Sequence, residues 1–593
     1  MRKDLFGAAA ILAAALPLQA SGAQIVTPPV AAPGTVTITG VDVATVNAPT
    51  GSPLTRETVL PAEGAGLSLG YARGETIDAA FVNRQFERNR LIGQPVSTAQ
   101  LIDMVQLINA ALLRQGYVNS GLLLDPAVEV TDGAPLKLRL IFGRLGTADG
   151  STTGVAIDWG KAGRRGLDEG YITARMPAAG QVPVNAADIE RDFRLLSEDP
   201  TIRSVRADLR PLGPAGEAQL ALAIDAALPY DLYVTVANNR TPSVGGERAA
   251  LGGSARNLLV GSDLFAFEVG RTSGVTDAVA SYALPIFDDD LRLNVRAGLN
   301  NAAVIDPALL ALDISARDRF VEGGLAYTLS ERPLIPTAAG GWTSARALTV
   351  GASILHRRTR TFLFGLPFSF TPGSVRGRAE YTALRGSIDF VDRDPTQALT
   401  ASLIGTLGLE GTRSDVPGLP QPPKNFRVIL GQVNYARRLT DDRLELRARV
   451  TGQWTDKILY TAERFSIGGS NTVRGYRESL LLADRGVVGS VELAQPFSLS
   501  GRQRPNAGVD LGSFTASVFA DGGWTDNVGP ADPVPRWIAS VGASLLWTPS
   551  DALTARVTFG QALRDAAVVG GRDLQDRGFQ FFVTVRPLEL FRS

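Results

Sequence analysis

The sequence predicts two small α+β modules followed by a sixteen-stranded antiparallel transmembrane β-barrel. Three observations lead to this fold class. The first residues have the composition of an export signal, the next two hundred mix helical and extended patterns, and the chain from about Leu228 onward follows a period of two. A period of two separates apolar from polar side chains on the two faces of a strand, and a period near 3.6 does so on a helix.

The N-terminus predicts export. Arg2 and Lys3 precede an apolar run over residues 5–16, and residues 21–23 supply small side chains for cleavage. These features are typical of a secretory signal peptide over residues 1–23. The run is too short to span a bilayer, and no later stretch has the roughly 18 uninterrupted apolar residues of a membrane helix. The exported chain is therefore expected to be soluble or to enter a membrane as a barrel.

Two modules are predicted between a short Pro-rich segment, residues 24–34, and the barrel. The first covers residues 35–146 with an insertion at 48–75, and the second covers residues 147–227. Each combines a helix of regular apolar spacing with alternating strands. The expected helices are 97–117, with Ser97 as N-cap, and 185–199, and the expected strands are 35–46, 135–145, 202–212 and 218–226.

Residues 443–454, RLELRARVTGQW, show the pattern of the barrel, residues 228–593. One face of this stretch is apolar, whereas the other is polar and mostly charged. Trp537 and Trp547 lie near the two ends of another apolar face, as in interfacial girdles. A soluble β-sandwich also alternates, but the aromatic ends and the many arginines favour a membrane barrel with a wet lumen. The charged side chains expected to face this lumen are Arg292, Arg296, Glu445, Arg447, Arg449 and Arg556.

About sixteen strand-like segments are predicted, a count that follows from the period-two pattern. Closing them into a barrel pairs every backbone group in lipid, and an even number is usual for a bacterial barrel. The predicted starts are residues 230, 247, 262, 275, 289, 317, 345, 375, 397, 425, 443, 487, 513, 536, 553 and 578.

Composition excludes several function classes. The net charge is zero, so no electrostatic argument supports a nucleic-acid partner. The chain has no cysteine and one histidine, His356, which excludes thiolate or His-rich metal sites and a Cys-His or Ser-His nucleophile. His356 stands beside arginines and is expected at a strand end. Without a nucleotide-binding motif, the sequence predicts no enzyme, cofactor or metal.

The longest connection, between the eleventh and twelfth segments, has an unusual composition. Residues 463–482, ERFSIGGSNTVRGYRESLLL, surround Arg474 with small and polar residues, yet keep more apolar side chains than a solvated loop needs. From spacing alone, the favoured interpretation is an exposed arginine, with Asp521-Gly522 in a hairpin turn. The alternative is a loop inside the pore, with an arginine whose planar fork binds one wall carboxylate. The apolar residues are Phe465, Ile467, Val473, Tyr476 and Leu480.

Several stretches carry a resemblance to a known family. Residues 112–145 and 184–211 are similar to its first and second polypeptide-transport-associated (POTRA) domains, and residues 255–270 are similar to an early strand pair of its barrel. Val473-Arg474-Gly475-Tyr476 matches the tip of a loop that folds into the lumen, and residues 519–523 match a Phe-x-Asp-x-Gly motif on the thirteenth strand. The chain thus resembles the outer-membrane transporters of two-partner secretion, the haemolysin and filamentous-haemagglutinin secretion/activation proteins.

The resemblance implies how the two motifs meet. The loop over residues 463–486 would lie in the lumen, with Arg474 paired to Asp521 on the inner wall. Phe519, Asp521 and Gly523 form the wall motif, and Phe519 would face the lumen and pack against apolar residues of the loop. Some family members carry a helix that plugs the pore, but residues 24–34 are too short and Pro-rich for one.

The resemblance also implies a function: a pore of the bacterial outer membrane with its POTRA domains in the periplasm. These domains would capture an unfolded partner exoprotein, large and β-helical like a haemolysin or adhesin, and the barrel, embedded in outer-membrane lipid, would pass it to the surface. Residues 135–142 and 218–225 are either exposed strand edges that add a cargo strand or paired core strands. The main alternative is a barrel-assembly factor of the same superfamily; a passive porin and a barrel-fused enzyme are weaker alternatives.

Overall fold

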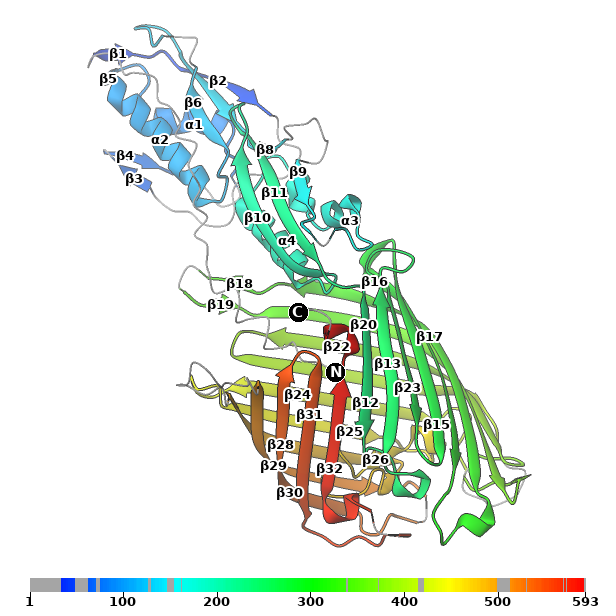
Figure 1. The fold of residues 1–593 in the computed structure, drawn as a ribbon. Helices are drawn as coiled ribbons and strands as arrows, with labels where there is room; N and C mark the ends of the chain where they lie inside the picture. Colours follow the sequence, from blue (N-terminus) through cyan, green and yellow to red (C-terminus); the bar gives the residue numbers. More distant parts are fainter. Residues whose placement is uncertain are drawn as a thin grey trace. The chain divides into compact units, whose positions relative to one another are not determined.

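Figure 1 shows the computed structural model of the chain. The chain divides into two compact units, one ending at Ala227 and one beginning at Leu228. The predicted signal peptide, nearly all of the Pro-rich segment in which no plug helix is expected, and most of the predicted insertion lie outside the described residues. The structure describes residues 34–47, 62–64, 66–70, 75–125, 129–146, 154–161, 163–337, 340–371, 373–413, 421–498, 512–529, 531–568, 570–571 and 573–590.

The first unit begins with a sheet of three strands covered by two helices. The strand order is β2-β7-β6, with β2 parallel and β6 antiparallel to the central strand β7. Helices α1 and α2 bury Phe81 and Ile108 in a core that includes Leu138 of β7. The elements are β1 Thr35–Thr37, β2 Val41–Val46, β3 Ala62–Gly64, β4 Leu67–Leu69, α1 Ala79–Arg88, β5 Pro95–Ser97, α2 Thr98–Arg114, β6 Gly121–Leu124 and β7 Leu136–Ile141.

The predicted cap of α2 is confirmed. The Ser97 hydroxyl accepts the Gln100 N–H at 3.2 Å, and the Gln100 side chain accepts the Ser97 N–H at 3.0 Å. This reciprocal capping box satisfies two N–H groups that the helix itself cannot pair. The helix therefore starts where the sequence predicts, and it ends at Arg114, three residues before the predicted end.

A second sheet follows in the first unit. Strand β11 lies between antiparallel β10 on one side and parallel β8 and β9 on the other. Helix α4, capped by Asn185, and helix α3 contribute Leu196 and Ile172 to a separate core with Leu222 of β11. The elements are β8 Arg144–Leu145, β9 Val155–Asp158, α3 Glu169–Ala174, η2 Pro177–Gly180, α4 Ala186–Glu198, β10 Ile202–Pro211 and β11 Glu217–Ala226.

Two expectations for the first unit are corrected, and one open alternative is resolved. The predicted strand over residues 35–46 is divided, because β1 pairs with β5 while β2 pairs with β7. The predicted strand over residues 135–145 is divided, because β7 ends at Ile141 while Arg144 and Leu145 pair with β11 of the second sheet. Arg144 also donates from Nε to Glu217 at 3.0 Å, which ties this short strand to β11. In addition, both strands considered as exposed edges are central, since β7 and β11 have partners on both sides. They have no free row of backbone groups for a cargo strand.

The second unit is a closed antiparallel barrel of sixteen long strands, so the predicted fold class is confirmed. Each strand starts within three residues of its predicted start. The strands are β12 Tyr230–Ala237, β13 Arg248–Arg256, β14 Leu264–Arg271, β15 Val275–Ile286, β16 Asp288–Ala303, β17 Ser315–Arg332, β20 Ala345–Leu363, β22 Arg378–Arg393, β23 Gln397–Gly411, β24 Arg427–Arg438, β25 Glu445–Trp454, β28 Arg485–Ser498, β29 Ser513–Asp526, β30 Trp537–Ser550, β31 Leu553–Ala562 and β32 Phe579–Val585.

Shorter elements lie in the connections between the barrel strands. The two-residue β21 extends the hairpin at the end of β20, and β18 pairs with β19. These elements are η3 Pro242–Val244, η4 Leu310–Leu312, β18 Ile335–Pro336, β19 Trp342–Thr343, β21 Leu366–Pro367, η5 Thr461–Glu463, β26 Phe465–Ile467, β27 Leu481–Ala483, η6 Gln575–Arg577 and α5 Pro587–Leu590.

Closure and chain order give the barrel its orientation. The first strand, β12, pairs with the last, β32, in a register from Val234↔Val585 to Ala237↔Phe582. Strand β12 follows directly after the first unit, so the end of the barrel at Tyr230 is the end that the chain enters. The connections at the opposite end include the long one from β25 to β28, in line with the short periplasmic turns and longer extracellular loops of such barrels.

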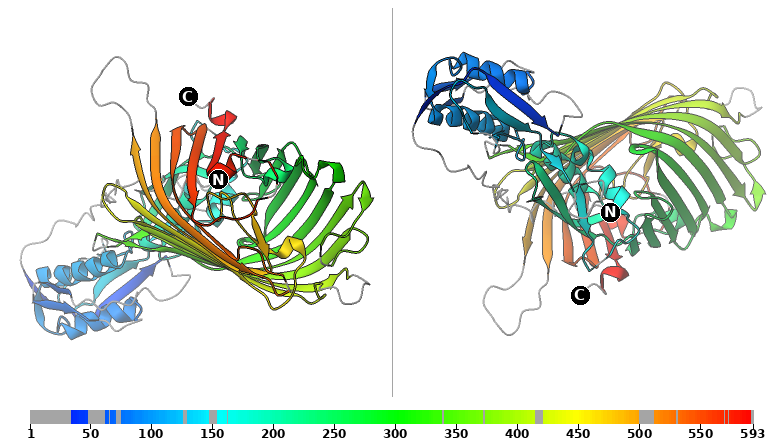
Figure 2. Two further views of the ribbon diagram at one scale, coloured as in Figure 1. Left: turned by 90° about the horizontal axis from the view of Figure 1, so that it is seen from below. Right: turned by 90° about the horizontal axis from the view of Figure 1, so that it is seen from above.

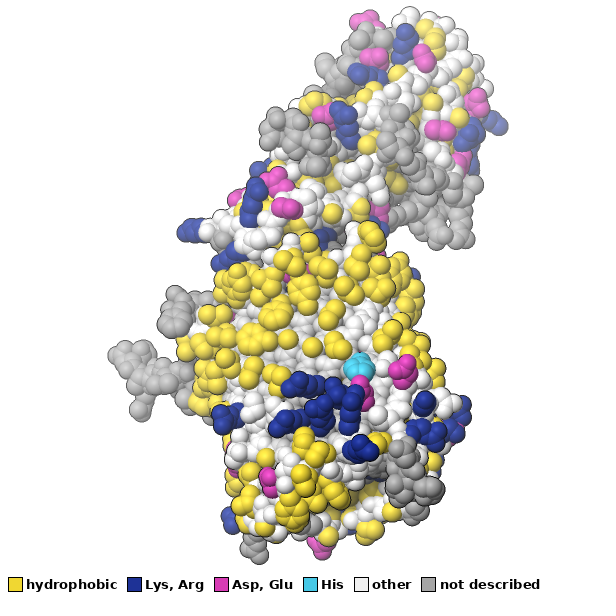
Figure 3. Space-filling view, turned by 90° about the vertical axis from the view of Figure 1, so that its right-hand side faces the viewer, with side chains coloured by type: hydrophobic (Ala, Val, Ile, Leu, Met, Phe, Trp, Pro, Cys, Tyr) yellow, Lys and Arg dark blue, Asp and Glu magenta, His cyan; other side chains and the backbone are white. Residues whose placement is uncertain are grey.

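The outer face of the barrel is apolar. Val450, Val518 and Val541 are exposed and point outward from three different strands. Trp524 pairs with Trp537 near one end of this face, and Phe514 stacks on Trp547 near the other, as expected for interfacial girdles. Figure 3 shows a broad apolar belt around one side. None of the helices that the structure describes has both the length and the apolar run that a bilayer crossing requires.

Candidate functional site: the lumenal loop

The connection between β25 and β28, residues 455–484, lies inside the ring of strands and is called the lumenal loop below (Figure 2). It contains the turn η5 and a hairpin of β26 and β27, in which Phe465 pairs with Ala483. The predicted loop, residues 463–486, covers most of it and also includes the first two residues of β28.

The tip of the lumenal loop is attached to β29 through Arg474 and Asp521. Arg474 donates to Asp521 Oδ2 from its backbone N–H at 3.0 Å and from Nε at 2.8 Å, and to Oδ1 from Nη2 at 2.8 Å. The side chain of Asp521 is 0 % exposed and that of Arg474 is 10 % exposed. A bidentate pair with a further backbone donor satisfies the carboxylate well, which a buried ion pair needs to offset its desolvation. The structure thus brings the two residues into direct contact.

Three other wall residues surround the Arg474 guanidinium. Nη1 donates to Glu492, Nη2 donates to Ser490 Oγ at 3.1 Å, and the guanidinium carbon lies 3.4 Å from the centre of the Phe519 ring. In the β28–β29 register Ser490 faces Asp521 and Glu492 faces Phe519, so the four form one patch of the inner wall. Phe519 faces the lumen, as the resemblance implies, and its ring lies against the Arg474 guanidinium in a cation–π contact.

Glycines allow the tip to approach the wall closely. Gly475 has φ of +87°, and a Cβ atom there would lie 2.6 Å from the Gly560 carbonyl oxygen of β31. A Cβ on Gly560 would in turn lie 2.7 Å from the Gly475 nitrogen. Gly523 of β29 has a similar role, because a Cβ there would lie 2.8 Å from Ile467 Cδ1. The glycines of both motifs therefore provide space for backbone and side-chain contact between loop and wall.

Tyr476 and Arg477, which follow the tip arginine, add further contacts between the lumenal loop and the wall. The Tyr476 hydroxyl lies 2.9 Å from the carbonyl oxygens of both Ala539 and Arg564, and it accepts the Arg564 N–H at 3.2 Å. Arg477 donates from Nε to Asp576 at 2.6 Å. The tip is thereby held by β29, by β30 and by the connection between β31 and β32.

The apolar residues of the lumenal loop form a small core with the wall. Val488 of β28 and Ile538 of β30 supply the wall side of this cluster. Leu480 packs at its margin. The loop is therefore apolar because part of it is buried inside the barrel. The buried loop members are Phe465, Ile467, Val473, Tyr476 and Leu481.

The beginning of the lumenal loop contacts the opposite part of the wall. Glu463 is 8 % exposed; it accepts the Tyr381 hydroxyl at 2.6 Å and Arg385 Nη2 at 2.8 Å, both from β22. Tyr460 stacks on Tyr381 with ring centres 4.6 Å apart. The loop therefore crosses the lumen, with contacts to β22 at one point and to β28–β31 at another.

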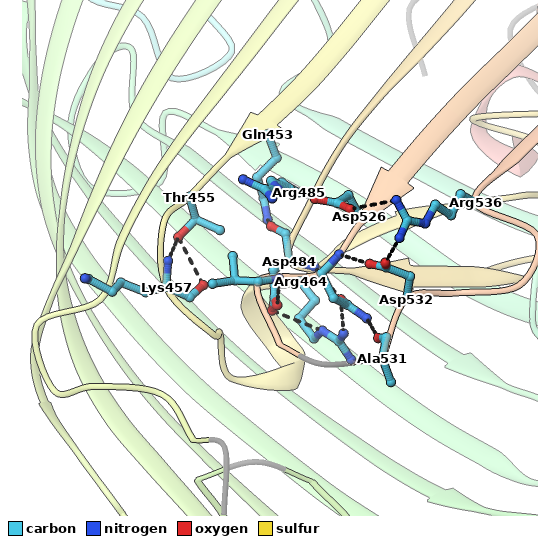
Figure 4. A network of polar contacts seen from close by, with 12 residues as sticks. Gln453, Thr455, Lys457, Arg464, Asp484, Arg485, Asp526, Ala531, Asp532 and Arg536 are labelled. Atoms are coloured by element: carbon cyan, nitrogen blue, oxygen red, sulfur yellow. Dashed lines mark hydrogen bonds and ion pairs between the residues drawn. The ribbon is translucent and has the colours of Figure 1, made fainter.

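The base of the lumenal loop is tied to the neighbouring connection, residues 527–536, by the network in Figure 4. Asp484 is 2 % exposed and accepts the backbone N–H groups of Leu459 at 3.1 Å and Val528 at 3.0 Å. Arg464 Nε lies 3.4 Å from the same carboxylate. The base is thus held through main-chain donors, which do not depend on the side chains at the tip.

The other predicted lumenal charges lie on the inner face, since the register puts Arg447 opposite Glu492, Arg449 opposite Ser490 and Arg296 opposite Glu322. Arg447 pairs with Glu445 at 2.7 Å, and Arg449 donates to the carbonyl of Asn471 in the lumenal loop. The remaining positions have simpler contacts. Arg296 lies over Phe320 and Arg556 over Phe582, and Arg292 donates to Ser262 at 3.1 Å. His356 lies within β20, with Nε2 3.4 Å from Glu380.

Sequence reasoning missed several residues of the site. Ser490 and Glu492 follow the lumen-facing alternation of β28, but only the exact register shows that they flank Asp521. Gly560 occupies a lumen-facing position of β31. A glycine at such a position could have indicated that another backbone approaches the wall there. No sequence signal pointed to the contact of Glu463 with β22, because it joins an aperiodic loop to a strand about eighty residues away.

The closed barrel, its apolar outer face, and the loop held across its lumen define a class of protein, an outer-membrane barrel with a loop folded into its lumen. The family model described as "Haemolysin secretion/activation protein ShlB/FhaC/HecB" matches residues 378–529, which include the lumenal loop and the wall motif. Over these residues the chain is similar to this family. It is thus a protein transporter of the outer membrane, with its N-terminal POTRA-like region in the periplasm, and the family is not one of enzymes.

Two solved structures share the whole architecture. CdiB from Escherichia coli is 18 % identical, with a TM-score of 0.58 over 95 % of this chain and 93 % of that chain. CdiB from Acinetobacter baumannii is 15 % identical, with a TM-score of 0.55 over 94 % of this chain and 91 % of that chain. At these identities the likeness shows the fold. No curated protein matches the sequence.

Proposed function

We propose that this transporter secretes one large exoprotein, a β-helical haemolysin- or adhesin-like partner, and that the lumenal loop is its releasable plug. The observation that supports this proposal is the way the loop is held. Its tip is held by contacts centred on the Arg474–Asp521 pair, whereas its base is held separately, by contacts centred on Asp484. A loop attached in this way can leave the wall at its tip while its base stays in place.

The capture step is assigned to the two periplasmic modules, residues 35–146 and 147–227. Because β7 and β11 are paired on both sides, a cargo strand would add to an outer strand instead. Strand β10 is the favoured acceptor, since it is ten residues long and pairs only with β11 among the described strands. Main-chain pairing at such an edge accepts many sequences, which suits an unfolded client.

Transport needs a source of direction but no cofactor in this proposal. The lumen is lined by charged side chains such as Arg447 and Arg556, which keep it hydrated and discourage apolar segments from adhering. Folding of the exoprotein outside the cell buries apolar surface, and this favourable step makes return unfavourable. The alternative, a barrel-assembly factor, predicts a different set of clients.

Quantitative proteomics of the medium and of the outer membrane, with and without the gene, tests the proposal. The deletion strain is complemented with the wild type, with Asp521→Asn, or with Asp389→Asn. Asp389 is a matched control because it is a barrel carboxylate that accepts a hydrogen bond from Ser402 at 2.6 Å and, among the described residues, has no hydrogen bond or ion pair with the lumenal loop. The membrane level of each variant shows whether it is inserted.

We expect one large exoprotein to disappear from the medium in the deletion strain. The wild type and Asp389→Asn restore it, whereas Asp521→Asn does not. If many barrel proteins decline together and no exoprotein is singled out, the chain is an assembly factor and the proposal is wrong. If Asp521→Asn secretes as well as the wild type, the tip pair is not the latch of the plug.

A further inference from the structure

Five arginines gather on the outer wall of the barrel, at the extracellular ends of β17, β20 and β22. Figure 3 shows them as a cationic area beside the single histidine, at the edge of the apolar belt. They lie in two neighbouring cross-strand rows. One row is Arg317–Arg360–Arg378, and the next is Arg319–Arg358–Glu380. We call these five residues, Arg317, Arg319, Arg358, Arg360 and Arg378, the outer arginine patch.

Strand alternation shows that the outer arginine patch points away from the lumen. Val321 and Leu325 share its face of β17 and are 48 % and 47 % exposed. The intervening residues of β17 point inward. Among them, Asp318 accepts a hydrogen bond from Arg357 Nη2 at 2.8 Å. The arginines therefore continue the lipid-facing surface toward the extracellular end. A polypeptide inside the lumen does not meet them.

The outer arginine patch has more positive charges than the carboxylates around it can neutralise. Glu380 lies 3.6 Å from Arg358 and also contacts Arg378. Across the part of the chain that the structure describes, Arg317, Arg319 and Arg360 have no carboxylate at ion-pair distance. Arg317 instead lies over the Phe362 ring, 5.2 Å from its centre. Glu410, opposite Thr382 in the register, is a further carboxylate on this face of the wall.

This arrangement is unfavourable without a counter-charge. Directly opposed residues of neighbouring antiparallel strands have Cβ atoms about 5 Å apart, and like charges there destabilise the sheet. Arginine on a lipid-facing wall also costs free energy, although this cost is much smaller near the interface than at the bilayer midplane. Long side chains reduce it further by placing their apolar stems along the wall and their charges toward the headgroups. An anion at headgroup depth would remove the remaining repulsion.

We propose that the outer arginine patch binds the phosphate groups of a phosphorylated glycolipid in the outer leaflet. The planar guanidinium fork matches phosphate oxygens, and several forks at neighbouring positions suit a ligand with more than one phosphate. The apolar belt directly below, which includes Val321, Ile354 and Leu384, accepts the acyl chains of the same molecule. This continuity of cationic and apolar surface favours a lipid over a soluble anion or an exoprotein.

The test uses the full chain purified in detergent and measures its binding to bisphosphorylated lipid A. Dephosphorylated lipid A and inorganic phosphate, at equal concentration, separate the contribution of the phosphates from those of the acyl chains and of a free anion. The patch variant is Arg317→Gln/Arg319→Gln/Arg360→Gln. The matched control is Arg332→Gln/Arg346→Gln, a cross-strand arginine pair at the periplasmic ends of the same two strands, β17 and β20.

Bisphosphorylated lipid A should bind the wild type and the control alike, and the triple variant at least about tenfold more weakly, because several charge-assisted contacts are lost. The other two probes should bind much more weakly to all three proteins. Arg360→Gln alone, with a smaller loss expected, covers the case in which the triple variant does not fold.

Three results would overturn the proposal. The first is equal affinity of the patch variants and the wild type for bisphosphorylated lipid A. The second is equally tight binding of dephosphorylated lipid A or of inorganic phosphate. The third is unchanged lipid A binding together with reduced exoprotein secretion by the triple variant, which would assign the patch to the exoprotein.

Discussion

The two sides of the barrel wall use arginine in opposite ways. In the lumen, Arg474 and Arg477 each have a carboxylate partner, Asp521 and Asp576, and both arginines are buried. On the outer wall, Arg317 of β17 is paired directly with Arg360 of the neighbouring strand β20. Among the described residues, neither has a carboxylate at ion-pair distance. The difference shows that arginine content alone does not indicate role. A paired and buried arginine holds a structure, and an unpaired row at a lipid interface is suited to a ligand.

Burial explains why each of these lumenal arginines has a carboxylate partner. Removing one partner of a buried pair leaves an uncompensated charge at low dielectric, which typically costs about 3–5 kcal/mol. An exposed arginine is screened by solvent and ions, and its pairs are worth about 0–1 kcal/mol. We therefore expect the lumenal tip to respond strongly to single substitutions and the outer patch to respond weakly unless its ligand is present.

The largest effect is expected from Asp521→Asn. It leaves the Arg474 guanidinium with only Glu492 as a charged partner, so the tip of the lumenal loop should detach at a cost of about 3–5 kcal/mol. The chain has no cysteine, so Val473→Cys provides a single reporter at a side chain that is 0 % exposed. A membrane-impermeant maleimide added to intact cells should label this cysteine slowly in the wild-type background and rapidly with Asp521→Asn.

Asp389→Asn in the same background should leave the labelling slow. Equal labelling rates with Asp521→Asn and with the wild type would mean that Tyr476, Arg477 and the apolar cluster hold the tip without the ion pair. In that case the lumenal side would resemble the outer side more closely than we argue.

The second effect concerns the close backbone approach at the tip. Gly560→Ala puts a Cβ 2.7 Å from the Gly475 nitrogen, a distance that forces the loop or the strand to move. Overpacking of this kind typically costs about 1–3 kcal/mol, so labelling of Val473→Cys should rise by less than with Asp521→Asn. Gly522→Ala in β29 is the control, since a Cβ there meets no atom within 4 Å. Similar labelling in both glycine variants would show that the tip tolerates the contact.

Much of this comparison was accessible from the sequence. The period of two located sixteen strands and put Arg447 on the inner face, because alternation reports which face a side chain occupies. It also put Phe519 and Asp521 on one face of their strand, but only the family resemblance indicated that this face is the lumenal one. The Arg474–Asp521 contact was expected only through the family resemblance. The outer arginine patch was not predicted from the sequence, because the grouping of its side chains depends on the register across three strands.

Other features could not be predicted from the sequence, because they depend on contacts between distant segments. The position of β8 in the second sheet and the central positions of β7 and β11 are set by pairings between distant segments, which local propensity does not encode. The path of the lumenal loop from β22 to β29 likewise depends on contacts such as Glu463 with Arg385. A sequence pattern indicates that such a loop is partly buried, but not which wall it meets.

The first unit provides a third arginine environment, outside the membrane. Arg175 lies 3.5 Å from the centre of the Tyr171 ring and 3.2 Å from Asp199, and the Tyr171 hydroxyl donates to Asp199 at 2.6 Å. Burial, followed by the nearby Asp199 charge, raises the pKa of Tyr171 from 10.0 to about 12. The folded state holds this proton more tightly than the unfolded state. Its contribution to stability is therefore present below pH 10 and is lost as the pH rises toward 12.

Absorbance at 295 nm measures this contribution. The difference between the wild type and Tyr171→Phe should show one phenol that titrates near pH 12, and the variant should lose about 1–2 kcal/mol less stability between pH 10 and 12. A midpoint near 10 in the difference curve would mean that the phenol is not shielded, and that this compensated cluster is weaker than those of the lumen.

The smallest effect is expected on the outer wall in the absence of lipid A. Arg317→Gln/Arg319→Gln/Arg360→Gln removes exposed charges that have no acidic partner among the described residues, so the stability of the detergent-purified barrel should change by no more than about 0.5 kcal/mol. The sign should be stabilising, because like charges no longer face each other across β17 and β20. Thermal unfolding followed by gel mobility measures this shift. Labelling of Val473→Cys should stay slow, because the patch and the lumenal loop lie on opposite faces of the wall. A large loss of stability in pure detergent would show that these arginines hold the barrel together as the lumenal ones do, and the contrast between the two sides would then be wrong.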